Sequence, residues 1–238
     1  MACVLVTRSE PGASETATRL RAMGHDAIVA PLLTIEPVAA RADIAGFQAV
    51  LFTSATGVAM FARVTPDRAL PTYCVGDATG DGARAEGFTD VRVAGGDVGA
   101  LAGLVAASAR PDAGPLLHAA GADLAGDLKG ALEVQGFTVD RRIFYRAVPA
   151  EALPPAVDAA LAADPPGIDI VVFHSARGAQ AFARCAKPEA RLNRITALCL
   201  SDAVATAAQA RDWRAVVAAQ EPREAALLAL VLAVPVEI

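Results

Sequence analysis

Residues 52–63 read FTSATGVAMFAR and residues 173–184 read FHSARGAQAFAR, with seven of the twelve aligned positions identical. The likeness continues downstream, where LPTYCVGDATGDGARAEGF at 70–88 parallels ITALCLSDAVATAAQARDW at 195–213. In each copy an apolar strand pattern leads into a small-residue turn, an alanine-rich helical pattern and then an aromatic residue. Self-similarity of this kind indicates a duplicated unit of alternating strands and helices.

A second repeat involves other segments of the chain. It pairs VLVTRSEPGASETATRLRAMGHDAIVAPLLTIEP at 4–37 with LLHAAGADLAGDLKGALEVQGFTVDRRIFYRAVP at 116–149. Gly24 and Gly136 hold equivalent positions after a helical pattern, where a glycine commonly ends the helix. With this repeat written as a and the first as b, the chain reads a–b–a′–b′.

Short apolar runs mark the expected strands, and helical patterns separate them. The runs are Cys3–Val6, Ala49–Phe52, Thr72–Val75, Leu116–Leu117, Ile168–Phe173, Thr196–Leu200 and Val216–Ala218. Runs without polar alternation are typical of strands buried on both faces of a parallel sheet. The whole pattern predicts an α/β protein of ten strands, arranged as two five-stranded parallel sheets with helices on both faces.

The repeats leave open which segments share a domain. Either a packs with b and a′ with b′, or b and a′ form one domain (38–144) while a and b′ form the other (1–34 with 150–238). In the second arrangement the equivalent segments at about 33–38 and 143–149, which are both extended and each have a proline near the end, would be two connectors.

The composition narrows the range of functions. Of the 238 residues 54% are hydrophobic and 20% charged, and the net charge is −5, so no overall field attracts nucleic acid.

No apolar run reaches the roughly 18 residues of a membrane span, and the longest, AALLALVLAVPV at 225–236, contains Pro235. The N-terminus lacks a basic leader, which favours the cytoplasm. The four cysteines show no metal-ligand spacing, so buried thiols and no metal site are expected.

Small or hydroxylic residues follow most of the expected strands, where a doubly wound sheet collects its ligands and helix N-termini offer free N–H groups to anions. The segments are Thr7-Arg8, Thr53-Ser54, Gly76 to Thr79, His118 to Gly121, His174-Ser175 and Ser201-Asp202. A structural role is equally open, because Ser54, Ser175 and Ser201 are also typical helix N-caps. Arg8 suits an anion contact or a surface salt bridge.

Three side chains are candidates for proton transfer. His118 and His174 lie at strand ends, where each is either an acid–base group or a half-buried, hydrogen-bonded imidazole. Tyr145 lies in the second connector and carries a phenol donor. The sequence holds no dinucleotide or Walker glycine motif, no GxSxG elbow and no HExxH. We therefore expect no cofactor.

Taken in order, these segments resemble the uroporphyrinogen-III synthase family over nearly the whole chain. The resemblance is carried by LVTRSEPGA, APLLTIEP, VLFTSATGVAMFA, YCVGDATGDGARAEGF, HAAGADLAGDLKGALEVQGF, IFYRA and VVFHSARGAQAFA. It implies two flavodoxin-like five-stranded domains, 1–34 with 150–238 and 38–144, with the connectors as a two-stranded link. It also implies a cofactor-free hydro-lyase of tetrapyrrole (heme, chlorophyll, cobalamin) biosynthesis, which cyclises hydroxymethylbilane to uroporphyrinogen III with loss of water and inversion of ring D.

The resemblance carries site residues over position by position. The substrate-binding positions are Thr7, Arg8, Ser54, Gly76, Thr79, Gly121, Ser175 and Ser201, with Ser201 in place of a threonine hydroxyl. Tyr145 is the expected catalytic residue, which assists departure of the substrate hydroxyl.

The implied partner is hydroxymethylbilane, with a transient contact to the preceding enzyme of the pathway. We expect a monomer that meets neither nucleic acid nor membrane. The alternative hypothesis is a non-catalytic two-domain α/β protein that binds an anionic small molecule or has a regulatory role.

Overall fold

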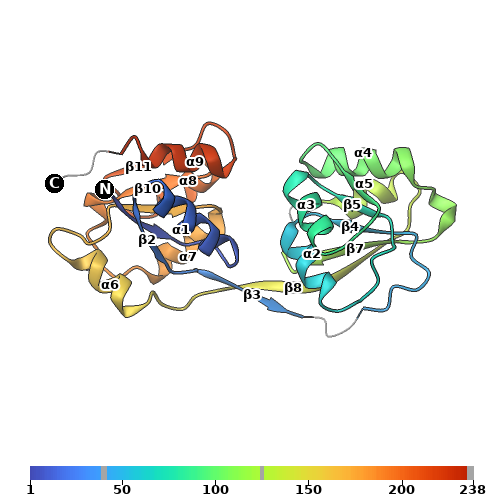
Figure 1. Ribbon diagram of the computed structural model, residues 1–238, viewed down its shortest axis with the longest axis horizontal. Coiled ribbons are helices and arrows are strands. Elements are labelled where there is room, and N and C mark those ends of the chain that lie inside the picture. The colour runs from blue at the N-terminus through green and yellow to red at the C-terminus, as the bar shows by residue number, and fades with distance from the viewer. Residues whose placement is uncertain (39–41, 124–125, 235–238) are drawn as a thin grey trace. The chain divides into compact units, whose positions relative to one another are not determined.

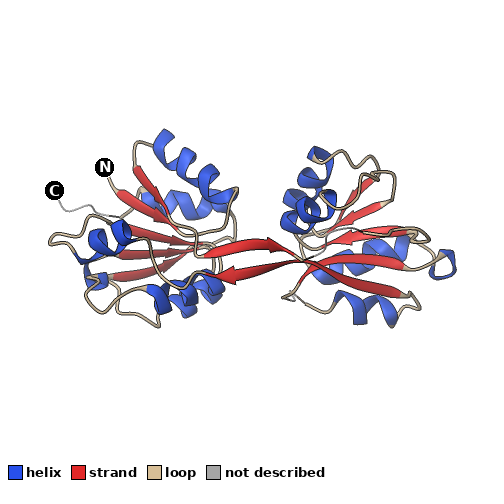
Figure 2. Cartoon of the chain, turned by 90° about the horizontal axis from the view of Figure 1, so that it is seen from below, coloured by secondary structure: helices blue, strands red, loops and turns tan. Residues whose placement is uncertain are grey.

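The computed structural model of the chain describes residues 1–38, 42–123 and 126–234. The chain divides into two compact units, unit 1 with Met1–Ile35 and Val148–Ile238, and unit 2 with Glu36–Ala147. Each unit is a sheet with helices on both faces (Figure 2). The predicted α/β class with parallel sheets is confirmed.

The sheet of unit 1 has five strands in the order β11-β10-β9-β1-β2, and each neighbouring pair is parallel. The strands are β1 (Cys3–Val6), β2 (Asp26–Val29), β9 (Ile170–Phe173), β10 (Thr196–Cys199) and β11 (Ala215–Ala218). The sheet therefore places the start of the chain beside a segment that lies more than 160 residues further on, with Val4 in register with Ile170.

Two helix layers cover this sheet. Helices α1 (Gly12–Ala22) and α9 (Glu224–Val231) lie on one face, and α6 (Pro155–Ala162), α7 (Ala176–Cys185) and α8 (Asp202–Ala208) on the other; a short 3-10 helix spans Leu192–Arg194. Because side chains alternate along a strand, Val4 and Val6 pack toward α1 while Leu5 packs on the opposite face. The apolar runs of the sequence thus fill two cores.

The second sheet has six strands in the order β3-β8-β7-β4-β5-β6. The strands are β3 (Leu33–Pro37), β4 (Ala49–Phe52), β5 (Thr72–Cys74), β6 (Val91–Val93), β7 (Leu116–Gly121) and β8 (Val139–Pro149). The prediction of five strands was wrong by one, because β3 hydrogen-bonds to β8 and joins the sheet at its edge. Strand β8 has 11 residues, which is long enough to pair with both β7 and β3.

The helices of unit 2 also form two layers (Figure 1). They are α2 (Ala55–Ala62) and α3 (Asp77–Ala85) on one face and α4 (Val98–Ser108) and α5 (Leu128–Glu133) on the other, with a 3-10 helix at Pro111–Ala113. Four phenylalanine rings fill the α2 side, where Phe61 packs edge-on against Phe52 and Phe144 at 5.5 and 5.3 Å. This ring cluster anchors β8 against α2.

Two helices end as the sequence predicts. Gly24 after α1 and Gly136 after α5 have φ of 85° and 86°, a conformation that glycine adopts without a steric penalty. In both cases the residue after the glycine donates its N–H to a leucine carbonyl in the last helical turn, at 3.1 and 3.2 Å. The equivalent helix ends of repeats a and a′ are thereby confirmed.

The apolar C-terminal run forms α9 as far as Val231, and Pro235 lies outside the described residues. In the described part of the chain, no helix is both long enough and apolar enough to cross a membrane.

Candidate functional site

Each sheet has one pair of neighbouring strands from which the chain continues toward opposite edges of the sheet. In unit 1 this point of divergence lies between β1, which leads to β2, and β9, which leads to β10 and β11; in unit 2 it lies between β7 and β4. Ligands of open α/β sheets bind at the carboxyl ends of the strands beside such a point. Arg8 and Ser175 follow the two strands at the point in unit 1, and Ser54 and Gly121 stand at the ends of the two strands in unit 2.

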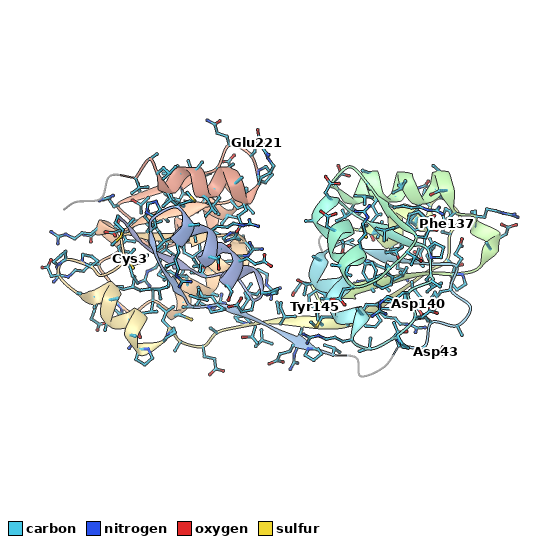
Figure 3. All side chains as sticks on the ribbon, viewed as in Figure 1. Cys3, Asp43, Phe137, Asp140, Tyr145 and Glu221 are labelled. Atoms are coloured by element: carbon cyan, nitrogen blue, oxygen red, sulfur yellow. The ribbon has the colours of Figure 1, made fainter. Side chains whose placement is uncertain are left out.

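Tyr145 and Ser54 meet at the edge in unit 2. The phenol oxygen of Tyr145 lies 2.9 Å from Ser54 Oγ, and either hydroxyl can be the donor. Ser54 is the N-cap of α2, and its Oγ accepts the N–H of Gly57 at 3.0 Å. The capping role and the contact with Tyr145 are therefore both present, in one side chain. Figure 3 shows Tyr145 on β8.

An irregularity in β8 aims Tyr145 at this helix. Ala120 pairs with Ile143 but Gly121 pairs with Tyr145, so Phe144 is an extra residue opposite β7. In a regular strand Phe144 and Tyr145 would point to opposite faces, whereas a bulge redirects one of them. Phe144 contacts a phenylalanine of α2 while Tyr145 reaches its N-cap, so both side chains serve the same helix.

Gly121 makes room for the phenol ring. A Cβ at this position would lie 2.7 Å from Tyr145 Cζ and 3.0 Å from its hydroxyl oxygen, both well inside van der Waals contact. Gly121 was expected in a loop after the strand, but β7 extends to include it, because residues 118–121 continue the pairing with β8. Its role here is to support Tyr145 rather than to form a turn.

Gly76 and Thr79 lie on the other side of β4. Gly76 is the N-cap residue of α3, and a Cβ there would come within 3.3 Å of Gly96 Cα, so two loops of the edge approach closely. Thr79 lies in the first turn of α3, where its N–H donates to Gly76 O at 3.0 Å, and its side chain is buried. The structure therefore brings Gly76, but not the Thr79 hydroxyl, to the surface of this edge.

His118 is an interior residue of β7, although its place in the sequence predicted a position beyond the strand end. It is 3% exposed; its Nε2 lies 3.5 Å from Thr53 Oγ1, and its Nδ1 has no hydrogen-bond partner. Burial, and secondarily the charge of Arg141, lower the pKa of His118 from 6.5 to about 4. The imidazole is therefore neutral near pH 7, which argues against a role as the proton donor.

Thr7 and Arg8 follow β1 in unit 1. Thr7 is buried and its hydroxyl donates to Val172 O of β9 at 2.8 Å, a bond that ties the two strands together at the edge. Arg8 Nη1 forms an ion pair with Glu224 Oε1 at 3.1 Å, with a third of the Arg8 side chain exposed. Of the two roles that the sequence left open for Arg8, the salt bridge is present.

Glu224 is a polar residue of this edge that sequence reasoning missed. Its carboxylate accepts from Thr16 Oγ1 and pairs with Arg8 and Arg19, and its side chain is 18% exposed. The neighbouring His174 is the largest cause that lowers the pKa of Glu224 to about 2; burial raises it, while Thr16 and the two arginines lower it further. A glutamate in the first turn of a helix was the available signal, but the segment was interpreted only as an apolar helix.

His174 and Ser175 follow β9. His174 Nε2 lies 3.7 Å from Glu224 Oε1, and burial is the main cause that lowers the pKa of His174. Ser175 caps α7 by accepting the N–H of Gly178 at 3.1 Å, as Ser54 does in the other unit. Ser201 is the N-cap residue of α8, as predicted, but its side chain makes no capping hydrogen bond.

Metal ligation has no support in the described ranges, where no group of three or more His, Cys, Asp or Glu side chains is placed to hold an ion. All four cysteines are free thiols; Cys74, Cys185 and Cys199 are buried and Cys3 is half-buried. Burial raises the pKa of Cys199 to about 12 and that of Cys74 to about 11, so both remain protonated.

The model of the family described as "Uroporphyrinogen-III synthase HemD" matches residues 14–229. This chain belongs to the uroporphyrinogen-III synthase family. The family predicted from the sequence is confirmed. The function of the chain therefore lies in tetrapyrrole biosynthesis, and the activity is that of a lyase-type enzyme, the uroporphyrinogen-III synthase.

Two solved structures are similar over almost the full length of the chain. The first is a uroporphyrinogen-III synthetase from Helicobacter pylori, with a TM-score of 0.64, 17% identity and 98% of this chain and 99% of that chain covered. The second is a mutant uroporphyrinogen III synthase from Thermus thermophilus, with a TM-score of 0.56, 18% identity and 98% and 97% covered. At such identities the likeness concerns the fold. No curated protein sequence matches significantly.

Proposed function

We propose that the chain cyclises hydroxymethylbilane to uroporphyrinogen III, with loss of one water and inversion of ring D. The observation that carries the chemical assignment is the Tyr145–Ser54 hydroxyl pair, at 2.9 Å, at the carboxyl ends of the strands of unit 2. This pair is a proton donor supported by a second donor, which is what departure of a hydroxyl group requires.

The domain organisation belongs to the same proposal. Unit 1 and unit 2 serve as the two domains of the enzyme, and both are flavodoxin-like. The strands β2-β1-β9-β10-β11 follow the 2-1-3-4-5 order of that fold, and β8-β7-β4-β5-β6 follow it too when β7 is counted first. On this interpretation β3 and the distal part of β8 are the two connectors.

Tyr145 acts at the first step. The terminal C–O bond of the substrate breaks with push from the adjacent pyrrole nitrogen, and the leaving hydroxyl takes the phenol proton to become water. Ser54 Oγ accepts from the Gly57 amide and can turn its own hydrogen toward Tyr145, where it stabilises the phenolate that forms. The later loss of a proton from the closed ring restores the phenol, so the cycle consumes no net acid.

Each sheet, taken by itself, has groups at its strand ends that suit a carboxylate of the substrate. Hydroxymethylbilane is a polycarboxylate, and the N-termini of α2 and α7 present backbone N–H groups beside Ser54 and Ser175. Arg8 is paired with Glu224 but keeps a third of its side chain exposed, which leaves it able to contact a carboxylate in unit 1. Holding a reactive chain in a productive conformation can supply as much as about 7–11 kcal/mol of the barrier reduction, so binding groups carry more of the catalysis than the single acid.

The enzyme works without a bound helper. It acts as a monomer in the cytoplasm, needs neither metal nor organic cofactor, and meets the preceding enzyme of the pathway only transiently.

The test is turnover with isomer analysis. Hydroxymethylbilane is supplied to the purified chain, and its consumption is compared with spontaneous closure in the absence of protein. The expected product is isomer III, formed faster than the spontaneous isomer I. Tight binding of hydroxymethylbilane with no acceleration and only isomer I would instead favour the non-catalytic binding protein.

A further inference from the structure

Arg141 is held at the carboxyl end of β7. It lies on β8, in register with His118, and its Nη2 donates to the carbonyls of Gly121 and Ala122 at 2.6 and 3.3 Å. Gly121 is the last residue of β7, beside the point where the connections of the sheet diverge. The guanidinium is therefore fixed at the edge where the fold collects ligands.

The charge of Arg141 has no counter-charge in the described part of the chain. No carboxylate there lies within ion-pair distance of it, and its buried Nε has no hydrogen-bond acceptor. The next residue differs, because Arg142 pairs with Asp140 at 2.8 Å. A partly buried cation with an unfilled donor and no counter-charge is unfavourable unless an anion binds to it.

His118 presents a second unfilled group on the same face of the sheet. Residues in register on neighbouring parallel strands point to the same side, so the His118 and Arg141 side chains lie together. His118 is almost fully buried, and its Nδ1 has no partner. Its Nε2 lies 3.5 Å from Thr53 Oγ1, at the limit of a hydrogen bond, so Nδ1 is the unfilled atom of the ring.

We propose that Arg141, with His118 beside it, forms a carboxylate-binding site at the edge of the unit 2 sheet. A guanidinium binds a carboxylate through parallel N–H donors, and a single cation beside a neutral imidazole matches a monoanion better than a phosphate dianion. Resting on the proposed function, the natural ligand is one side-chain carboxylate of the tetrapyrrole. Arg141 is then a substrate-binding residue, whereas Tyr145 supplies the proton.

The kinetic test compares Arg141→Gln, Arg141→Lys and the control Arg142→Gln. The control removes the same charge from the same strand, but its guanidinium is already paired with Asp140. Arg141→Gln should raise KM for hydroxymethylbilane about ten- to hundredfold with little change in kcat, because a charge-assisted bond made equally in ground and transition states is lost. Arg141→Lys should recover part of the loss, and Arg142→Gln should stay within about twofold of wild type.

The binding test does not depend on turnover. The imidazole of His118 is followed by NMR while propionate is added to the full chain. In wild type the His118 signals should shift saturably and the pKa of His118 should rise, since the bound carboxylate offsets the Arg141 charge. In Arg141→Gln this saturable shift should be lost, while Arg142→Gln should keep it.

The outcomes separate this inference from the proposed function. A wild-type chain that turns over, with no His118 response to propionate and an unchanged KM in Arg141→Gln, would overturn the carboxylate site alone. A response to inorganic phosphate at lower concentration than to propionate would overturn the choice of ligand. A chain that binds propionate through Arg141 but does not consume hydroxymethylbilane would support the site and count against the synthase. Thermal unfolding of each variant, together with Arg141→Lys, separates lost binding from lost folding.

Discussion

Lowering the pH should destabilise unit 2 through His118. The folded protein lowers the pKa of His118 from 6.5 to about 4, mainly because the ring is buried and secondarily because Arg141 is close. Between these two pH values His118 is protonated in the unfolded chain but mostly neutral in the folded chain. Above about pH 6.5 His118 therefore costs the folded state nothing through protonation, and the free energy of unfolding decreases as the pH falls from there toward about 4.

The size of the effect follows from the two pKa values. At about pH 5 the unfolded histidine is almost fully protonated and the folded one is not, which lowers the free energy of unfolding by about 2 kcal/mol relative to about pH 8. Full protonation of both states brings the loss to about 3 kcal/mol. Such a loss is a large fraction of the stability of an ordinary domain.

The assay is urea unfolding at several pH values, in wild type and in His118→Gln, which removes the titrating ring. Tyr73 and Tyr145, the two tyrosines of the chain, both lie in unit 2, and the single tryptophan, Trp213, lies in unit 1. Tyrosine near-ultraviolet dichroism therefore follows unit 2, and tryptophan fluorescence follows unit 1. His118→Gln should lose less stability on acidification than wild type by about 2 kcal/mol in the tyrosine signal.

Contributions from acid-sensitive groups of unit 1, such as His174 and Glu224, are common to both proteins and cancel in the comparison. Two results would refute the reasoning: an equal acid loss in wild type and variant, or an NMR titration of His118 that gives a pKa near 6.5.

Three further predictions concern the site. Tyr145→Phe should lower kcat about ten- to hundredfold, at the low end of general-acid effects because the pyrrole nitrogen also expels the hydroxyl, and should keep isomer III as product; the control Tyr73→Phe should keep the wild-type rate, and full activity of Tyr145→Phe would exclude Tyr145 as the acid. Arg8→Ala should raise KM about tenfold with little change in kcat, and an equal rise in Arg19→Ala would show that the effect passes through Glu224 instead. Ser175→Ala should lower the free energy of unfolding by about 1 kcal/mol through loss of the cap of α7, whereas Ser201→Ala, which removes no capping bond, should change it by less than about 0.5 kcal/mol.

Local patterns in the sequence predicted most of the elements. The apolar runs at residues 3–6 and 49–52 are strands with the predicted bounds, and Gly24 ends its helix with a positive φ. Ser54 and Ser175 cap the helices that follow them. These features are predictable because each depends on the chemistry of a few consecutive residues: apolar content, the steric freedom of glycine, or a hydroxyl three residues before a free N–H.

The arrangement of the polar groups was decided by tertiary structure. An extra residue opposite β7 turns Tyr145 toward Ser54, and pairing with β8 draws His118 and Gly121 into the strand that they were expected to follow. Glu224 reaches Arg8 only because α9 packs on the same face of the sheet as α1. Sequence patterns do not encode such contacts, since they join residues far apart in the chain and depend on strand register. A shift of one residue in that register would turn the same side chains to the opposite face of the sheet.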